Sequence, residues 1–169
     1  LMQFENMKSY MLYDLEKDGR RMIGVMTFNA ALDRMYKIGT GKKVRLMPLE
    51  EIVRAFGHLA FIGYSVKDKM MMRVTRNADF DTHIDDADLE HDFSEIMKKK
   101  VESRAKLNIV RLEVDKDDSK LKDFVLKLLK LNPKFCFKDE RFFDYKFMYS
   151  LGKYLPAEVS APLKYPPFK

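Results

Sequence analysis

The sequence predicts an α+β fold in which a mixed β-sheet is covered by helices within a single domain. Apolar residues alternate with a period of two in some segments and recur at helical spacing in others, and the two kinds of segment are similar in number. The chain has 169 residues, a usual length for one domain. A chain of this length buries roughly 70% of its unfolded surface, so it needs neither a disulfide nor a metal ion to fold. The pattern leaves the strand order open.

The first part of the chain predicts three strands and a helix. The segment SYMLYDLEKDGRRMIGVMTF predicts two strands joined at Asp18-Gly19, which is a favoured hairpin turn. The segment KKVRLMP predicts a third, short strand. Pro48 then opens a helix, because proline suits the first turn and the two glutamates in that turn favour its positive end. The expected apolar face of this helix consists of Ile52, Val53, Phe56, Leu59 and Ala60.

The middle of the chain predicts a strand, a long helix and another strand. Residues 64–75 alternate between apolar and polar side chains, which is typical of a strand with one buried face. Asp85 and Asp86 then precede a long segment with apolar residues at helical spacing. The period of two returns in LNIVRLEVD, which predicts a strand. The inward residues of this strand are expected to be Val110, Leu112 and Val114.

The last part predicts a helix, a short strand, a final short helix and an extended end. Asp118 and Ser119 can cap the first helix, which Asn132-Pro133 ends. The segment KFCFK predicts the last strand, and RFFDYKFMYSLG predicts a helix closed by Gly152. The apolar residues of the capped helix are Leu121, Phe124, Val125, Leu128 and Leu129.

Proline dominates the C-terminal segment and sets the expected domain boundary. We expect the domain to span residues 1–155 and residues 156–169 to form a Pro-rich exit segment that leads to another domain. Prolines disfavour both regular helix and central strand, so this segment is expected to be extended. These prolines are Pro156, Pro162, Pro166 and Pro167.

The charge balance and the single cysteine limit the partners and the compartment. The formal charge of +6 favours an anionic partner, but no nucleic-acid-binding signature is present, so nucleic acid is not expected. Cys136 excludes an internal disulfide and, without a Cys/His cluster, a structural zinc site. A buried, reduced Cys136 fits a cytoplasmic location. No apolar run approaches the about 18 residues needed to span a membrane.

Motifs for catalysis and for metal or phosphate binding are weak. His58 lies beside an apolar helix face and is expected to pack at the edge of the core. His83 lies among carboxylates, but an EF-hand needs a central glycine that this loop lacks, so an acidic helix start is the favoured interpretation. His91 is expected to be solvated. The segment GTGKKVRL precedes a strand, whereas a P-loop precedes a helix, so it is interpreted as a turn.

Arginines provide the candidate binding site. A guanidinium group binds phosphoryl oxygens in a bidentate manner, so these residues are candidate contacts for a polyanion. If the strands that carry Arg73 and Arg111 are neighbours, the two side chains can point to the same face. The alternative is that either arginine pairs across the strands with Glu113 or Asp115. The full set of candidates is Arg73, Arg76, Arg104 and Arg111.

Four blocks of the sequence resemble the middle, or head, domain of bacterial polyphosphate kinase. They are RLMPLEEIVRAF, GYSVKDKMMMRVTRNADFD, SRAKLNIVRLEVD and LKDFVLKLLKLNP, which follow in the order and spacing of that family and cover most of residues 43–135. The resemblance implies a full enzyme that uses ATP and magnesium to transfer the terminal phosphate to polyphosphate. It also implies a phosphorylated histidine in C-terminal domains outside this chain. No block corresponds to that histidine, so no catalytic, cofactor-binding or metal-binding residue is expected here.

The same resemblance implies a structural role for this segment. In the family the head domain is thought to help assemble a homodimer or higher homo-oligomer, to contact the other domains and to flank the polyphosphate tunnel. The segment alone is therefore predicted to be inactive. A stand-alone basic polyanion-binding module and a small enzyme that uses His83 are the alternatives. The full enzyme is expected in the cytoplasm, with peripheral association at the membrane as a further possibility.

Overall fold

The computed structural model confirms the α+β class and the mixed sheet. Its elements form two compact units of one small domain. The described residues are 3–28, 31–39, 45–77, 108–140 and 143–165. Unit 1 comprises Leu1–Phe28 and Gly63–Phe143, and unit 2 comprises Asn29–Ile62 and Asp144–Lys169.

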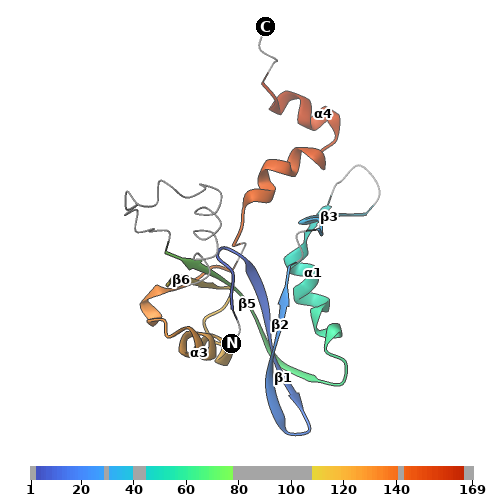
Figure 1. Cartoon of the computed structure of the whole chain (residues 1–169). Helices are drawn as coiled ribbons and strands as arrows, with labels where there is room; N and C mark the ends of the chain where they lie inside the picture. The colour runs from blue at the N-terminus through green and yellow to red at the C-terminus, as the bar shows by residue number, and fades with distance from the viewer. Residues whose placement is uncertain (1–2, 29–30, 40–44, 78–107, 141–142, 166–169) are drawn as a thin grey trace, which may run out of the picture. The chain divides into compact units, whose positions relative to one another are not determined.

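Unit 1 is built around a 5-stranded sheet with the order β2-β1-β5-β6-β7 (Figure 1). The pairs β2–β1, β1–β5 and β5–β6 are antiparallel, whereas β6 and β7 pair in parallel, which makes the sheet mixed. β7 is a short edge strand. The strands are β1 (Ser9–Lys17), β2 (Arg20–Thr27), β5 (Ser65–Arg76), β6 (Ile109–Val114) and β7 (Cys136–Lys138).

The predicted hairpin between β1 and β2 is confirmed. Asp18 and Gly19 both have positive φ, at 51° and 73°. Two consecutive residues with positive φ are typical of the type I′ turn, whose twist matches that of the flanking strands. The tight turn keeps β1 and β2 in one continuous register, which runs from Lys17 opposite Arg20 to Tyr10 opposite Thr27.

The central strand β5 is buried on both faces at its midpoint, not on one face as predicted. Met70, Met71 and Met72 are all 0% exposed. Successive side chains of a strand point to opposite faces, so Met70 and Met72 face α3 (Lys120–Leu129), whereas Met71 points to the opposite face beside its β1 partner Met11. We call these faces the α3 face and the opposite face.

Strand β6 differs from the prediction at Val110. Leu112 and Val114 are buried as expected, but Val110 is exposed. The register with β5 shifts here, since Thr75 lies opposite Arg111 while Arg76 lies opposite Ile109. Val110 is therefore the extra residue of a β-bulge, which takes its side chain out of the alternating pattern.

Helix α3 begins where predicted but presents a different apolar stripe. The Ser119 side chain accepts a hydrogen bond from the Leu121 backbone N–H at 3.1 Å, which is the expected N-cap. Leu121 and Val125 are buried, but Phe124 and Leu128 are exposed and Leu126 is buried instead. The helix ends at Lys130, which has a left-handed φ of 51°. Asn132-Pro133 starts the 3-10 helix η4 (Pro133–Phe135) and does not itself end α3.

Unit 2 contains a two-stranded sheet and several short helices. β3 and β4 are antiparallel, and β3 was not predicted. The C-terminal part forms three helical segments. Two of them lie beyond residue 156, where an extended conformation was predicted. The elements are β3 (Met35–Ile38), β4 (Arg45–Pro48), α1 (Leu49–Phe56), η1 (Gly57–Ala60), η5 (Lys146–Lys153), α4 (Ala157–Ser160) and η6 (Ala161–Leu163).

The predicted apolar face of α1 is confirmed only in part, because Ile52 and Val53 alone of its residues are half-buried. Phe56 is 61% exposed and Leu59 is also exposed, whereas Leu49 and Glu50 in the first turn are buried. The α-helix changes to the tighter 3-10 helix η1 after Phe56, so Leu59 and Ala60 leave the 3.6-residue stripe on which the prediction depended. The His58 side chain is exposed and does not pack at a core edge.

The tail prediction fails because proline is compatible with helix starts. Pro156 is the N-cap of α4, and Pro162 lies in the first turn of η6, where its missing N–H would have no helical partner. Gly152 lies inside η5 and does not close it. The boundary at residue 155 stays a prediction. None of the helices in the described part of the chain is long and apolar enough to cross a lipid bilayer.

Candidate functional site

The predicted arginine site lies on the opposite face of the unit 1 sheet. β5 and β6 are neighbours, and Arg73 lies opposite Glu113 in their register. Arg73 donates from Nε to Glu113 Oε2 at 2.7 Å and from Nη2 to Oε1 at 3.1 Å. Arg111 donates from Nη2 to the same Oε1 at 3.3 Å. The two arginines therefore share a face, as predicted, and the predicted alternative of cross-strand pairing with Glu113 is also confirmed.

Arg73 and Arg111 differ in what they can still bind. The Arg73 side chain is 12% exposed and holds Glu113 in a bidentate pair, which places it in the structure of the sheet. The Arg111 side chain is 45% exposed, and its guanidinium lies over the Phe137 ring with 4.1 Å between Cζ and the ring centroid. Stacking fixes the guanidinium plane and leaves N–H groups at its edge for an anion. We call Arg73, Glu113, Arg111 and Phe137 the arginine cluster.

Arg76 has a different role from the other two described candidates, Arg73 and Arg111. It donates from Nε and Nη2 to the carbonyl oxygen of Phe4, at 3.2 and 2.9 Å. Its backbone N–H donates to Asn6 Oδ1 at 2.8 Å. These bonds join the start of the chain to the end of β5. The fourth candidate, Arg104, lies outside the described residues, as do His83 and His91.

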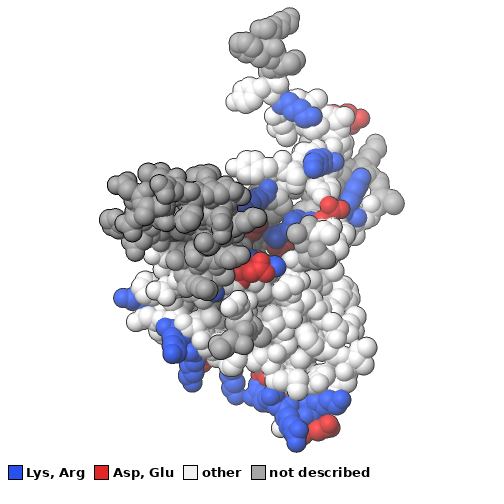
Figure 2. Space-filling view, viewed as in Figure 1, with Lys and Arg blue, Asp and Glu red and all other residues white. Residues whose placement is uncertain are grey.

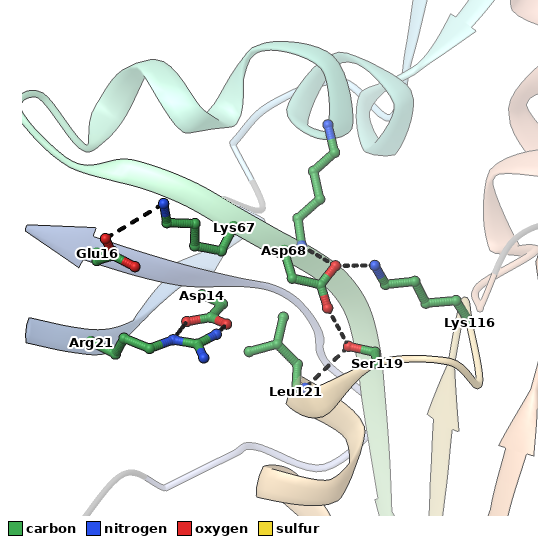
Figure 3. A network of polar contacts seen from close by, with 9 residues as sticks. Asp14, Glu16, Arg21, Lys67, Asp68, Lys116, Ser119 and Leu121 are labelled. Atoms are coloured by element: carbon green, nitrogen blue, oxygen red, sulfur yellow. Dashed lines mark hydrogen bonds and ion pairs between the residues drawn. The ribbon is translucent and has the colours of Figure 1, made fainter. Parts of the chain in front are cut away.

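A second polar cluster lies on the α3 face and was missed by sequence reasoning (Figure 3). Asp68 of β5 accepts hydrogen bonds from Ser119 Oγ at 2.6 Å, from the Lys69 backbone N–H at 2.8 Å and from Lys116 Nζ. Burial acts to raise the pKa of Asp68, but the hydrogen bonds from Lys116, Ser119 and Lys69 outweigh it and hold this pKa below its ordinary value. Asp68 thus connects the central strand to the N-cap of α3.

The neighbouring strand β1 contributes a second carboxylate to this cluster. Asp14, which is buried, lies opposite Asp68 in the register and accepts a hydrogen bond from Arg21 Nε at 3.1 Å. We call Asp14, Arg21, Asp68, Lys116 and Ser119 the aspartate network. The sequence signal for the two carboxylates of this network was a charged residue at an inward position of an alternating strand.

The aspartate network borders a groove of about 520 Å³, which Glu16, Lys67, Asp118 and Lys120 also line. Asp14 and Asp68 each have a cationic partner, and Lys67 lies 3.5 Å from Glu16. Nowhere in the described ranges do three or more His, Cys, Asp or Glu side chains come together in a way that could hold a metal ion. The network is therefore suited to holding α3 on the sheet.

Comparison with known proteins gives consistent matches. A family model described as the polyphosphate kinase middle domain matches residues 1–151. A polyphosphate kinase of Bacillus anthracis is 28% identical over 162 residues, which are 92% of this chain and 22% of that protein. One from Rhodopirellula baltica is 32% identical over 104 residues, which are 61% of this chain and 12% of that protein.

A solved structure shows a similar fold. The crystal structure of polyphosphate kinase from Porphyromonas gingivalis matches with a TM-score of 0.62 and 15% identity, over 99% of this chain and 23% of that chain. The chain thus spans about 22% of the length of the first curated relatives that it matches.

Proposed function

This chain belongs to the family of polyphosphate kinase middle domains, and on that premise we propose that it is a non-catalytic part of such an enzyme. The match of the family model to residues 1–151 carries the proposal. The longer enzyme would transfer the terminal phosphate of ATP to polyphosphate, with magnesium and a phosphorylated histidine supplied by its other parts. This segment would help to assemble a homo-oligomer and to shape the path of the polyphosphate.

The chemistry of the described side chains supports a non-catalytic role. A phosphohistidine mechanism needs a histidine positioned in a site by partners that orient it. The described histidine, His58, is exposed in η1, and both polar clusters of unit 1 consist of matched or shared ion pairs.

The direct test is turnover by the chain itself. We expect no growth of polyphosphate and no labelled histidine when the 169-residue chain is incubated with γ-labelled ATP, magnesium and polyphosphate. A full-length polyphosphate kinase in a parallel sample shows that the assay works. Either product from this chain would overturn the proposal.

A polyanion-binding role has one specific observation in its favour. The Arg111 side chain is 45% exposed and its guanidinium lies over the Phe137 ring, while Arg73 is engaged with Glu113 and Arg76 with the Phe4 carbonyl oxygen. Polyphosphate is the expected ligand because it presents a continuous row of phosphoryl oxygens. The same contact would serve either the wall of a tunnel in the full enzyme or a stand-alone binding module.

A further inference from the structure

The arginine cluster already holds an anion of its own. Glu113 Oε2 accepts a hydrogen bond from Arg73 Nε at 2.7 Å, and Glu113 Oε1 accepts one from Arg73 Nη2 at 3.1 Å. Two parallel N–H···O bonds are also the arrangement in which a guanidinium group binds a phosphoryl group. The Glu113 carboxylate therefore occupies the edge of Arg73 that a phosphate would need.

Glu113 also contacts Arg111, but less tightly. Its Oε1 accepts from Arg111 Nη2 at 3.3 Å, which is longer than the usual range of about 2.7–3.2 Å for an N–H···O bond. The Arg111 side chain is 45% exposed, whereas the side chains of Arg73 and Glu113 are 12% and 9% exposed. An anion in solution can thus compete for Arg111, while Arg73 stays with its partner.

The strand register keeps the Glu113 carboxylate in place. Glu113 lies opposite Arg73 of β5 on one side and opposite Phe137 of β7 on the other. Arg111 precedes the buried Glu113 by two positions in β6, so both side chains lie on the opposite face of the sheet. Because the backbone and the bidentate pair both hold the carboxylate, a phosphoryl group bound at Arg111 is repelled by a nearby negative charge.

We propose that Glu113 sets the affinity of this anion site, because its carboxylate competes with phosphoryl groups for Arg111 and keeps the contact weak. The inference rests on the proposed polyanion contact and names the residue that regulates it. A surface along which a polymer moves needs contacts that break as readily as they form, just as an ion pathway needs sites that release the ion. Arg111 attracts the polyphosphate chain, and Glu113 helps to release it.

Removal of the Glu113 charge is the direct test. The variant E113Q keeps the shape of the side chain and an oxygen acceptor for Arg73, but it removes the negative charge. We expect E113Q to bind polyphosphate about three- to tenfold more tightly than wild type at low salt, with a steeper dependence on salt. Fluorescence anisotropy with labelled polyphosphate measures both quantities. An affinity that is unchanged or lower in a folded E113Q chain overturns the inference.

Two matched variants separate the position of the charge from its mere removal. E113D keeps a carboxylate in the cluster, and E16Q removes one negative charge outside it, from the ion pair with Lys67. We expect both to bind polyphosphate within about twofold of wild type. A gain in E16Q or E113D as large as that in E113Q overturns the inference. Circular dichroism checks that each variant is folded.

A second basic surface calls for a further control. Figure 2 shows Lys and Arg gathered at the lower tip of the view, where the β1–β2 hairpin ends in Figure 1. Lys17 and Arg20 belong to this tip and are exposed. Polyphosphate attracted there by charge alone would respond to R20Q and not to Glu113. We therefore expect the full gain of E113Q to persist in the R20Q background, and its disappearance there overturns the inference.

An added carboxylate tests the same competition without a change to the buried pair, and it decides the question even if E113Q does not fold. Thr75 lies opposite Arg111 in the register of β5 and β6. Side chains at directly opposite positions are neighbours, so T75E places a second carboxylate beside Arg111. We expect T75E to weaken polyphosphate binding about three- to tenfold. The variants T75Q and T27E, the latter with the added charge outside the cluster, are expected to stay within twofold of wild type.

The outcomes separate this inference from the proposed function. Tighter binding by E113Q together with weaker binding by T75E supports the role of Glu113. If R111A weakens binding but E113Q or T75E leaves it unchanged, the role of Glu113 is overturned and the polyanion contact at Arg111 stands. If R111A, E113Q and T75E all bind as wild type does, both the contact and its regulation are overturned, and the non-catalytic role is unaffected.

Discussion

The arginine cluster and the aspartate network lie on opposite faces of the same central strand, yet their charges are arranged differently. In the aspartate network Asp14 pairs with Arg21 and Asp68 with Lys116, so each carboxylate has its own cation. In the arginine cluster a single carboxylate, Glu113, is shared by two guanidinium groups. One cluster is neutral and the other has a surplus positive charge. This surplus charge is the feature on which the proposed polyanion contact at Arg111 rests.

Among these substitutions, removal of Glu113 is expected to cause the largest loss of stability. Glu113→Ala leaves Arg73 with its charge, at 12% exposure, and without its carboxylate partner. Loss of one member of a buried ion pair costs about 3 kcal/mol or more, so we expect a loss of stability of that size. Urea unfolding measures it.

A matched control for Glu113 is available in β1. Glu16→Ala removes a carboxylate whose partner Lys67 is 43% exposed, and we expect a change within about 0.5 kcal/mol. Equal losses for the two variants would show that burial of the Arg73 pair has no energetic weight.

Loss of the α3 cap should have the next largest effect. Ser119→Ala removes the acceptor for the Leu121 N–H and also a donor to Asp68. An N-cap serine contributes roughly 1–2 kcal/mol, and we expect a decrease in that range in thermal or urea unfolding. Ser160→Ala, at a half-buried position at the end of α4, serves as the comparison. A change at Ser119 no larger than that at Ser160 would contradict the linking role of the aspartate network.

Acid should weaken the aspartate network in a defined direction. The pKa of Asp68 is lower in the folded chain than its ordinary value of 3.8, so the unfolded chain binds more protons between these two values. The stabilisation is therefore complete above 3.8 and is lost as the pH falls through the lower, folded pKa. We expect Asp68→Asn to be less stable than wild type at neutral pH and the difference to shrink in strong acid. A difference that grows on acidification would reverse the assigned sign.

Substitution of Arg111 should change stability least and binding most. We expect Arg111→Ala to lower stability by about 0.5–1 kcal/mol through the lost stacking on Phe137. The same variant should weaken binding of polyphosphate at low salt and reduce the dependence of that binding on salt, because one phosphate contact is lost. Fluorescence anisotropy with labelled polyphosphate measures both.

Lys134→Ala provides the matched control for Arg111. Lys134 also lies over an aromatic ring, 4.9 Å from the centroid of Phe135, and it is not part of the arginine cluster. We expect its removal to leave the affinity within about twofold of wild type. Equal weakening by the two variants would indicate that binding follows net charge and not the arginine cluster.

The predictable parts of the fold depended on neighbours in the sequence. The Asp18-Gly19 turn, the strand at β5 and the Ser119 cap each rest on local backbone or side-chain preferences, and each is present in the structure. The pairing of Arg73 with Glu113 was also foreseen as an alternative, because both lie on the polar side of alternating strands.

The features that sequence reasoning missed depend on contacts between distant segments. The bulge at Val110 is set by the register between β5 and β6. The aspartate network joins Asp68 to Ser119, 51 positions further along the chain. Such contacts require the arrangement of strands in the sheet, which the alternation of single strands leaves open.

The fully buried methionines of β5 give this sheet a chemical property of its own. A thioether becomes a polar sulfoxide when it is oxidised, and a sulfoxide at Met71 would have no water to solvate it. Met70, Met71 and Met72 are shielded from peroxide as long as the strands stay together, whereas Met22, 43% exposed, is open to it. The pattern of methionine oxidation along this chain would therefore record which strands have separated.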